Sequence, residues 1–453
     1  MTPAPGPTFF TDMVFKRLFD RGAAADPTDT DAAADPAEEM DDDSLTPEDD
    51  SDLPEDAPDR GWTARAADVI AGGASTGSKR AVGLYGTETP TVPTHFLHAS
   101  GCHLVADDGE TYVDCTMALG TVALGYAEPN VTRAVLDAVG GGHVSGLNSP
   151  LEVAVAEQLC GIIPCAERVR FFKTGGEATS AAVRLARTYT GRDVVVASGY
   201  LGWHDWASES AGVPEGVRRD VLRVPFDDVA ALDAAVERAG DRLAAVILEP
   251  VVERMPSDAW IARARERCDQ KGAALIFDEM KTGFRLAPGG YQEVSGVTPD
   301  LAAFGKALAN GFPLAAVCGR QDLMDAADRT WISSTLAGEA AALAAALAVI
   351  EWHTQADVCN ALATNGAEMR RVVSAAIEAS GVEGVTLEGL DPMWFLRFAD
   401  PAVESDFLQR SMAHGVLFKR GAYNYACVAH DDEAVRAIEA AASRALVEMR
   451  EGV

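Results

Sequence analysis

Three features of this 453-residue chain combine residue types that could do chemistry: a lysine, an aspartate and a glycine-rich turn. Lys306 stands in an apolar, glycine-flanked stretch, and burial lowers the pKa of an amine, which makes it a nucleophile able to form a Schiff base. Asp278 follows four apolar residues at the expected carboxyl end of a strand, where ligands bind in parallel α/β sheets. The turn Thr174-Gly175-Gly176 precedes an expected helix, and its backbone N–H groups could bind an anion such as a phosphate.

Each of these features also has an ordinary structural explanation. A lysine is usually solvated, an aspartate in this position can cap a helix or join a buried ion pair, and a Gly-Gly turn into a helix is a common structural device. The turn is neither a P-loop nor a dinucleotide-binding fingerprint. Together, however, the three features meet the requirements of a pyridoxal phosphate (PLP) site. The helix end holds the phosphate, the carboxylate keeps the pyridine nitrogen protonated, and the amine holds the aldehyde and moves the proton.

Alternating strands and helices are expected to position these residues. After residue 121, short runs rich in Val, Ile and Leu alternate with helical segments, which predicts a parallel sheet covered by helices. Before it, Asp107-Asp108-Gly109 indicates a hairpin, and the last hundred residues predict a second, smaller α/β domain. The strands are expected at 96–99, 103–106, 111–114, 169–172, 193–197, 244–248, 274–277, 385–388, 393–398 and 415–418. The helices are expected at 177–188, 259–271, 340–350, 356–380 and 432–450.

The charge of the chain excludes some classes of partner. It has 69 acidic and 38 basic side chains, a formal charge of −31. This field repels phosphate backbones and anionic membranes, so we expect no nucleic-acid or membrane partner. No stretch reaches the ~18 apolar residues of a membrane span. The eight cysteines form no CxxC pair and no secretory signal is seen, so we expect free thiols in the cytoplasm, and no metal site.

The first 60 residues differ from the rest of the chain. They contain 18 acidic and 4 basic residues, and residues 22–59 have almost no large apolar side chains, which predicts a disordered acidic extension. Within it, Phe15, Leu18 and Phe19 share one face of a short amphipathic helix near residues 9–20. That helix could dock onto a protein partner, or it could be a passive extension that packs weakly on the body.

From about residue 65 to its end, the chain resembles class III aminotransferases of PLP fold type I, and most closely the glutamate-1-semialdehyde aminomutase-like branch. The matching motifs run in family order over about 85% of the chain, and their combination is highly specific. They are Gly72–Arg80, Asp108–Asp114, Ser149–Val153, Thr174–Ala178, Gly199–Asp205, Leu248–Pro250, Phe277–Met280, Gly283–Arg285, Gly305-Lys306, Thr335–Glu339 and Ala429-His430.

The resemblance implies a role for each residue that matches a cofactor-binding position. Lys306 would form the Schiff base with the cofactor and shuttle the proton. Asp278 would pair with the pyridinium nitrogen, and Thr174, Gly175 and Gly176 would hold the phosphate with backbone amides. The family often has Ser-Gly-Thr in this turn, so here one hydroxyl donor is missing.

Four further residues receive roles from the resemblance. Tyr200 would stack on one face of the cofactor ring and Met280 would pack on the other, although both could instead be core residues. Thr335 would bind the phosphate of the other subunit's cofactor, which requires a homodimer with shared active sites. Arg80 would meet a substrate carboxylate, unless it is a surface arginine.

The implied fold is α/β, with a large domain built on a mainly parallel seven-stranded sheet and a smaller α/β domain. We expect residues 121–344 to form the large PLP-binding domain. Residues 345–453 would form the small domain, to which 61–120 contribute. The expected enzyme is a PLP-dependent aminotransferase acting on a primary amine or amino acid and a keto acid or aldehyde. An intramolecular aminomutase of the glutamate-1-semialdehyde type and an amino-acid racemase or epimerase use the same core residues and stay open.

Three other positions depart from the family pattern. Leu201 stands where a His usually follows the stacking Tyr, Leu119 where the aminomutases have a Trp, and Ala422 where they have a gating Glu. The last two changes argue against glutamate-1-semialdehyde as the substrate.

Overall fold

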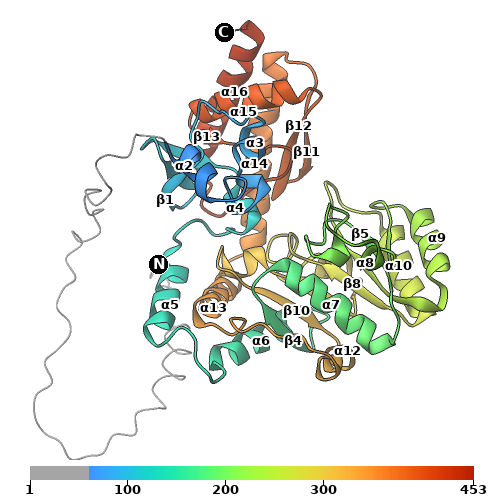
Figure 1. Ribbon diagram of the computed structural model, residues 1–453. Coiled ribbons are helices and arrows are strands. Elements are labelled where there is room, and N and C mark those ends of the chain that lie inside the picture. The colour runs from blue at the N-terminus through green and yellow to red at the C-terminus, as the bar shows by residue number, and fades with distance from the viewer. Residues whose placement is uncertain (1–60, 453) are drawn as a thin grey trace, which may run out of the picture. The chain divides into compact units, whose positions relative to one another are not determined.

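The computed structural model describes residues 61–452, so the expected docking helix at 9–20 lies outside the described residues. The chain divides into two compact units, one ending at Arg80 and the other spanning Ala81–Val453. In its described part, the first unit contains the helix α2 (Gly61–Val69) and the short turn η3 (Gly77–Lys79). All the elements considered next belong to the second unit, and Figure 1 labels most of them.

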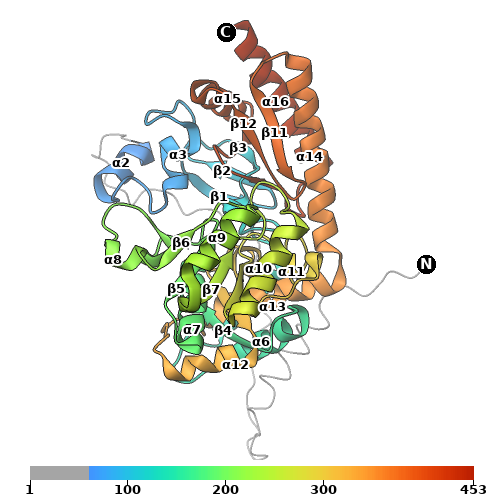
Figure 2. The same cartoon turned by 90° about the vertical axis from the view of Figure 1, so that its right-hand side faces the viewer.

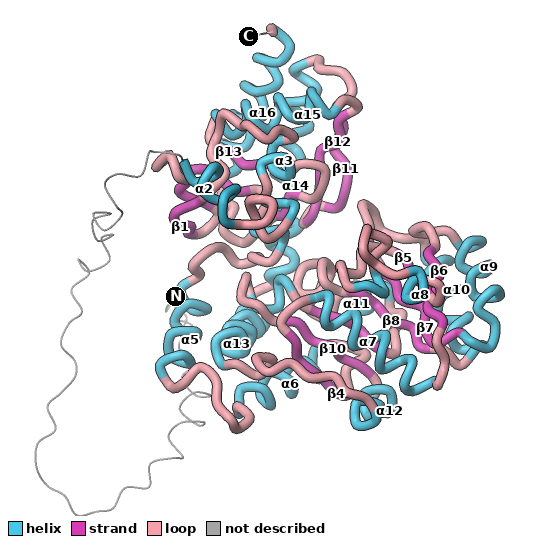
Figure 3. The backbone as a smooth tube through the Cα atoms, in the orientation of Figure 1, coloured by secondary structure: helices cyan, strands magenta, loops and turns pink. Residues whose placement is uncertain are grey.

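A seven-stranded sheet forms the centre of the second unit, in the order β4-β10-β9-β8-β7-β5-β6. Six strands run in the same direction, and β10 runs antiparallel to both of its neighbours. Figure 3 shows the strands in magenta. The predicted mainly parallel seven-stranded sheet is therefore confirmed. The strands are β4 (Arg168–Phe172), β5 (Val194–Ser198), β6 (Val221–Arg223), β7 (Leu243–Leu248), β8 (Ala274–Asp278), β9 (Leu301–Phe304) and β10 (Ala315–Gly319).

Helices cover both faces of this sheet (Figure 2). Alternate residues of a strand point to opposite faces. Val195 of β5 belongs to the same apolar cluster as Leu185 of α7, whereas Val196 belongs to the cluster that contains Trp260 of α10. Because both faces are buried, the strands are continuous apolar runs without polar alternation. The helices flanking the sheet include α5 (Pro129–Gly140), α6 (Pro150–Ile162), α7 (Gly175–Thr190), α9 (Val229–Ala239), α10 (Asp258–Lys271) and α13 (Ala340–Gln355).

Two smaller sheets combine segments from both ends of the unit. One has the order β1-β2-β3-β13, and β13 from the C-terminal region pairs in parallel with β3. The other has the order β11-β12-β14. The strands are β1 (Phe96–Ser100), β2 (His103–Ala106), β3 (Thr111–Asp114), β11 (Val385–Leu390), β12 (Met393–Phe398), β13 (Val416–Leu417) and β14 (Asn424–Tyr425). The accompanying helices are α14 (Val358–Ser380), α15 (Pro401–Ala413) and α16 (Asp432–Glu451).

Most sequence-predicted elements occur at the expected places, including the hairpin between β2 and β3. Gly109 in its turn has φ +84°, a conformation that glycine adopts without strain. The strands β6, β9, β10 and β14 were not predicted. No helix within residues 61–452 is long and apolar enough to cross a membrane.

Candidate active site

The carboxyl ends of the parallel strands meet at one edge of the seven-stranded sheet, and the predicted functional residues lie at these ends. Asp278 is the last residue of β8, and Lys306 follows β9 after a single glycine. Thr174 follows β4, and Tyr200 follows β5. The fold thus places four separate sequence motifs at the same edge, as expected for a ligand site in a parallel α/β sheet.

Asp278 and Lys306 come from neighbouring strands. Asp278 pairs in register with Ala303, three residues before Lys306. Its side chain is 4% exposed, and its Oδ1 accepts a hydrogen bond of 3.0 Å from the N–H of Met280. Burial, and then the charge of Glu249, raises the pKa of Asp278 to about 7, while the Lys306 ammonium opposes this shift. A positively charged partner would therefore favour the ionised carboxylate.

Lys306 is held as a partly buried amine in a strained backbone conformation. Its φ of 48° lies in the left-handed region, which non-glycine residues rarely adopt. Burial lowers the pKa of its ammonium, and the negative charge of Asp278 opposes the shift. A lowered pKa increases the fraction of neutral amine, the form that attacks carbonyl groups. Strain of this kind is tolerated mainly at functional sites.

The glycine-rich turn forms the N-terminus of α7. Thr174 is its N-cap and forms a capping box with Glu177. The Thr174 hydroxyl accepts a hydrogen bond from the Glu177 N–H. The Glu177 carboxylate accepts from the N–H groups of Lys173 and Thr174. Gly175 and Gly176 are the first two helical residues, whose N–H groups have no acceptor within the helix. These two amides therefore remain as donors for an anion.

Met280 packs between the turn and the lysine segment. A Cβ added to Gly175 would lie 2.9 Å from the Met280 sulfur, and one added to Gly305 would lie 2.8 Å from it. Any side chain at either glycine would therefore displace Met280. Met280 therefore contacts both the turn at Gly175 and the residue preceding Lys306.

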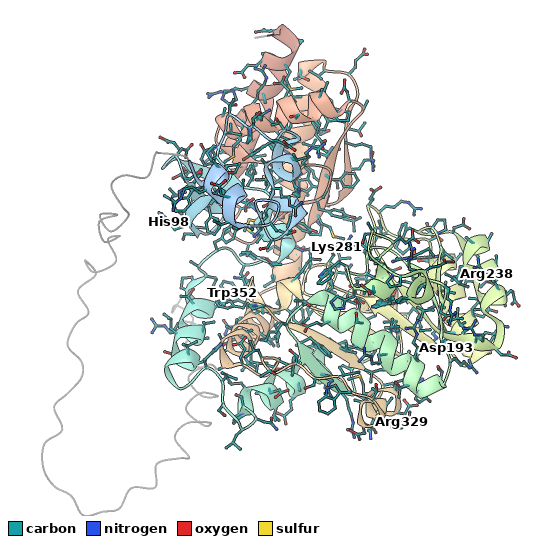
Figure 4. The ribbon with its side chains drawn as sticks, in the orientation of Figure 1. His98, Asp193, Arg238, Lys281, Arg329 and Trp352 are labelled. Carbon is teal, nitrogen blue, oxygen red and sulfur yellow. The ribbon has the colours of Figure 1, made fainter. Side chains whose placement is uncertain are left out.

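A buried ion pair that was not predicted from the sequence lies beside these residues. Lys281 Nζ is 2.7 Å from Glu249 Oε1, and both side chains are 10% exposed. The other carboxylate oxygen of Glu249 accepts from the N–H of Tyr200 at 2.9 Å, and Lys281 also donates to the Tyr423 hydroxyl at 3.2 Å. Figure 4 labels Lys281 within this region. The pair thus connects the ends of β7 and β8 with the Tyr200 segment and with Tyr423 of the C-terminal region.

We expect Lys281→Met to lower the free energy of unfolding by about 3 kcal/mol, because it leaves the Glu249 carboxylate buried without its partner. Urea unfolding followed by tryptophan fluorescence would measure this. The double variant Lys281→Met/Glu249→Gln, which removes both charges, should recover much of the loss. Equal losses in the single and double variants would contradict the assignment of the pair.

The remaining predicted site residues lie in different surroundings. Tyr200 is 73% exposed and so is not a core tyrosine. Thr335 is exposed in the loop before α13. Arg80 belongs to the other compact unit, where its guanidinium fills the space beside Gly72. The roles of these three residues toward cofactor and substrate remain predictions.

The positions that depart from the family pattern are also placed by the structure. Leu201 is buried, and its carbonyl oxygen accepts from the Thr179 hydroxyl at 2.8 Å. Leu119 lies in a left-handed turn with φ 61°. Ala422 directly precedes Tyr423, the residue that contacts Lys281.

Several known proteins are similar to this chain. The chain matches the family model of class-III aminotransferases over residues 85–201 and 216–429. The 3-aminobutyryl-CoA aminotransferase of Cloacimonas acidaminovorans is 33% identical over 75% of this chain and 86% of its own length. The glutamate-1-semialdehyde 2,1-aminomutase of Thermomicrobium roseum is 34% identical over 82% of this chain and 94% of its own.

Solved structures show the same fold. The FumI protein of Sphingopyxis sp. MTA144 in its PLP-bound form superimposes with a TM-score of 0.82 and 27% identity, over 86% of this chain and 96% of its own. An omega-transaminase from Sphaerobacter thermophilus gives a TM-score of 0.78 and 26% identity, over 86% of this chain and 97% of its own.

Proposed function

Because the chain belongs to the class-III aminotransferase family, whose members depend on PLP, we propose that it transfers an amino group between a primary amine or amino acid and a carbonyl acceptor. The observation that carries this proposal is the meeting of three groups at one sheet edge. They are the free amides after Thr174, the buried carboxylate of Asp278 and the amine of Lys306.

The residues present fit the cofactor. The N–H groups of Gly175 and Gly176 suit its phosphate, and the Asp278 carboxylate suits its ring nitrogen. Tyr200 and Met280 would cover its two faces. When bound, PLP supplies an aldehyde that condenses with amines and a ring that takes up the electron pair left by a departing proton.

In the proposed mechanism, the protein supplies attachment, charge and proton transfer. The Lys306 amine would hold the cofactor, and its Nζ, once free, would remove the proton from the substrate carbon that bears the nitrogen and would return a proton later in the reaction. Asp278 would keep the ring nitrogen protonated by its negative charge, and Arg80 would bind a substrate carboxylate.

The test is a panel of amino donors and keto acids. The purified enzyme with PLP should convert a donor to its carbonyl product, measured by chromatography, and should need a second carbonyl compound for continued turnover. If the enzyme transfers the amino group between two molecules, it should not rearrange a single substrate when no acceptor is present.

An intramolecular aminomutase is the second candidate, favoured by relatives such as the Thermomicrobium roseum enzyme. Leu119 and Ala422, which stand where the aminomutases have a Trp and a Glu, argue against glutamate-1-semialdehyde as its substrate. Rearrangement of a single amino aldehyde without any acceptor would support the aminomutase, and inversion at the carbon bearing the nitrogen would support a racemase or epimerase.

We further propose that the enzyme is a homodimer. Apolar side chains are exposed around Thr335: Trp331 is 84% exposed and Leu336 51%. Leu147, in the loop between α5 and α6, is 85% exposed. The two loops are linked, since the N–H of Ala340 donates to the carbonyl of His143 at 2.8 Å. Exposed apolar side chains on linked loops are typical of interfaces, and an interface here would bring Thr335 to the partner's cofactor.

We expect Leu147→Asp/Trp331→Glu to convert the dimer to a monomer of 47.7 kDa, because the double variant would place two charges in the interface. Sedimentation or light scattering would measure the mass. Val447→Asp, at an exposed apolar position of α16, is the control that should leave the mass unchanged. A monomeric starting protein, or a double variant that remains dimeric, would contradict the proposed interface.

The domain bounds, the cellular compartment and the protein partner are also proposals. Residues 121–344 would form the cofactor-binding domain, and residues 61–120 and 345–453 the smaller one. The eight cysteines are free thiols, which supports a reducing compartment such as the cytoplasm. The segment 9–20 would dock onto a protein partner. Deleting residues 1–60 should then abolish partner association and keep activity.

A further inference from the structure

The side chain of His204 lies beside the N-terminus of α7. A Cβ added to Gly176 would lie 3.4 Å from His204 Nε2, so the imidazole occupies the space next to the position where a side chain at Gly176 would begin. Gly202, with φ +102°, allows this approach, since a Cβ on it would lie 3.0 Å from the Cα of Gly176. The loop after β5 thus brings a ring nitrogen to the turn that carries the free amides.

Two neighbours fix the orientation of this ring. Trp206 Nε1 donates to the Ser180 hydroxyl at 2.8 Å, and that hydroxyl is 2.7 Å from His204 Nδ1. An indole N–H can only donate, so the Ser180 oxygen is the acceptor there, and its own proton is available for donation to Nδ1. A neutral imidazole that accepts at Nδ1 carries its proton on Nε2. The nitrogen beside Gly176 is then a hydrogen-bond donor.

We propose that His204 is a further cofactor-binding residue, which donates from Nε2 to the phosphate of PLP in place of the hydroxyl that Gly176 cannot supply. The proposal rests on the proposed function, because it takes the α7 N-terminus as the phosphate site. The ring occupies the space beside the missing side chain, and its donor is oriented by Ser180 and Trp206. Both features match an anion at this helix end.

The first test measures cofactor affinity instead of turnover. The full-length protein, freed of cofactor, is titrated with PLP and with pyridoxal, which lacks the phosphate, and binding is followed by absorbance. We expect His204→Ala to weaken PLP binding roughly 10- to 100-fold, the effect of one hydrogen bond to a charged group, and to leave pyridoxal binding unchanged. His98→Ala is the matched control. His98 is an exposed residue of β1, and Figure 4 labels it away from Lys281.

A second variant distinguishes the loss of a phosphate contact from a general loss of structure. Gly176→Thr restores a hydroxyl at the turn, and in the His204→Ala background there is room for it. The double variant should therefore recover most of the PLP affinity, whereas Gly176→Thr alone should crowd His204 and bring no gain. Recovery in the double variant is not expected if His204 only stabilises the loop.

The outcomes separate this inference from the proposed function. If the unmodified protein does not bind PLP, the proposed function fails. If it binds PLP and His204→Ala binds equally well, only the role of His204 is overturned. Equal weakening of PLP and pyridoxal would also overturn that role, because a phosphate donor must discriminate between them.

Discussion

Lys306→Ala should eliminate the covalent attachment of PLP and lower the turnover rate by at least roughly 10²–10⁴-fold, since one group both holds the cofactor and moves the proton. The loss would come from the missing amine and not from a change in backbone strain, because alanine and lysine are similarly strained at φ 48°. Borohydride reduction after saturation with PLP, followed by digestion and mass spectrometry, should find the modification at Lys306 in the unmodified enzyme and none in the variant.

Lys419→Ala is a suitable control for this experiment. Lys419 is also buried, and its ammonium donates to the carbonyl oxygens of Gly83 and Arg420. Its removal should lower thermal stability and leave the borohydride-trapped modification at Lys306 in place. Near-normal turnover of Lys306→Ala, or a reduced adduct on another residue, would refute the assignment.

Asp278→Asn should lower the turnover rate by roughly 100-fold or more while the protein still binds PLP. The amide has the same shape but no negative charge, so it cannot keep the ring nitrogen protonated, and preorganised charges of this kind are commonly worth about 10²–10³-fold. The rate of substrate proton removal, measured with a donor deuterated at the reacting carbon, should become limiting.

Asp300→Asn separates this effect from the loss of a buried carboxylate. Asp300 is 6% exposed, directly precedes β9, and pairs with Arg265 and Arg320. Since it lies at the amino end of its strand, its replacement should reduce stability without changing turnover. An unchanged turnover rate in Asp278→Asn would contradict the proposal that Asp278 keeps the ring nitrogen protonated.

The sequence predicted where these residues lie in the fold when a local rule applied. Asp278 and the Thr174 turn follow apolar runs, and in a parallel sheet such positions meet at the carboxyl edge. Lys306 was recognised from its apolar surroundings alone. Its strand, β9, was missed because Leu-Ala-Ala-Phe is rich in alanine, which favours helices and is depleted in strands. The same holds for β10, with the sequence Ala-Ala-Val-Cys-Gly.

Contacts between distant segments are harder to predict from the sequence. The Glu249–Lys281 pair did have a signal, because carboxylates end two successive strands and are followed by a lysine in an apolar setting. The approach of His204 to Gly176 left no such signal. It depends on the positive φ of Gly202 and on the Ser180 and Trp206 hydrogen bonds, which only the folded chain brings together.

The position of β10 has a consequence for synthesis of the enzyme on the ribosome. In the sheet, β10 lies between β4 and β9, yet it is made after both of them. Until residues 315–319 leave the exit tunnel, β4 has no neighbouring strand, and the turn that follows it has no fixed place relative to the lysine. We therefore expect that a nascent chain that stops before this point does not bind PLP, and that cofactor binding follows the insertion of β10.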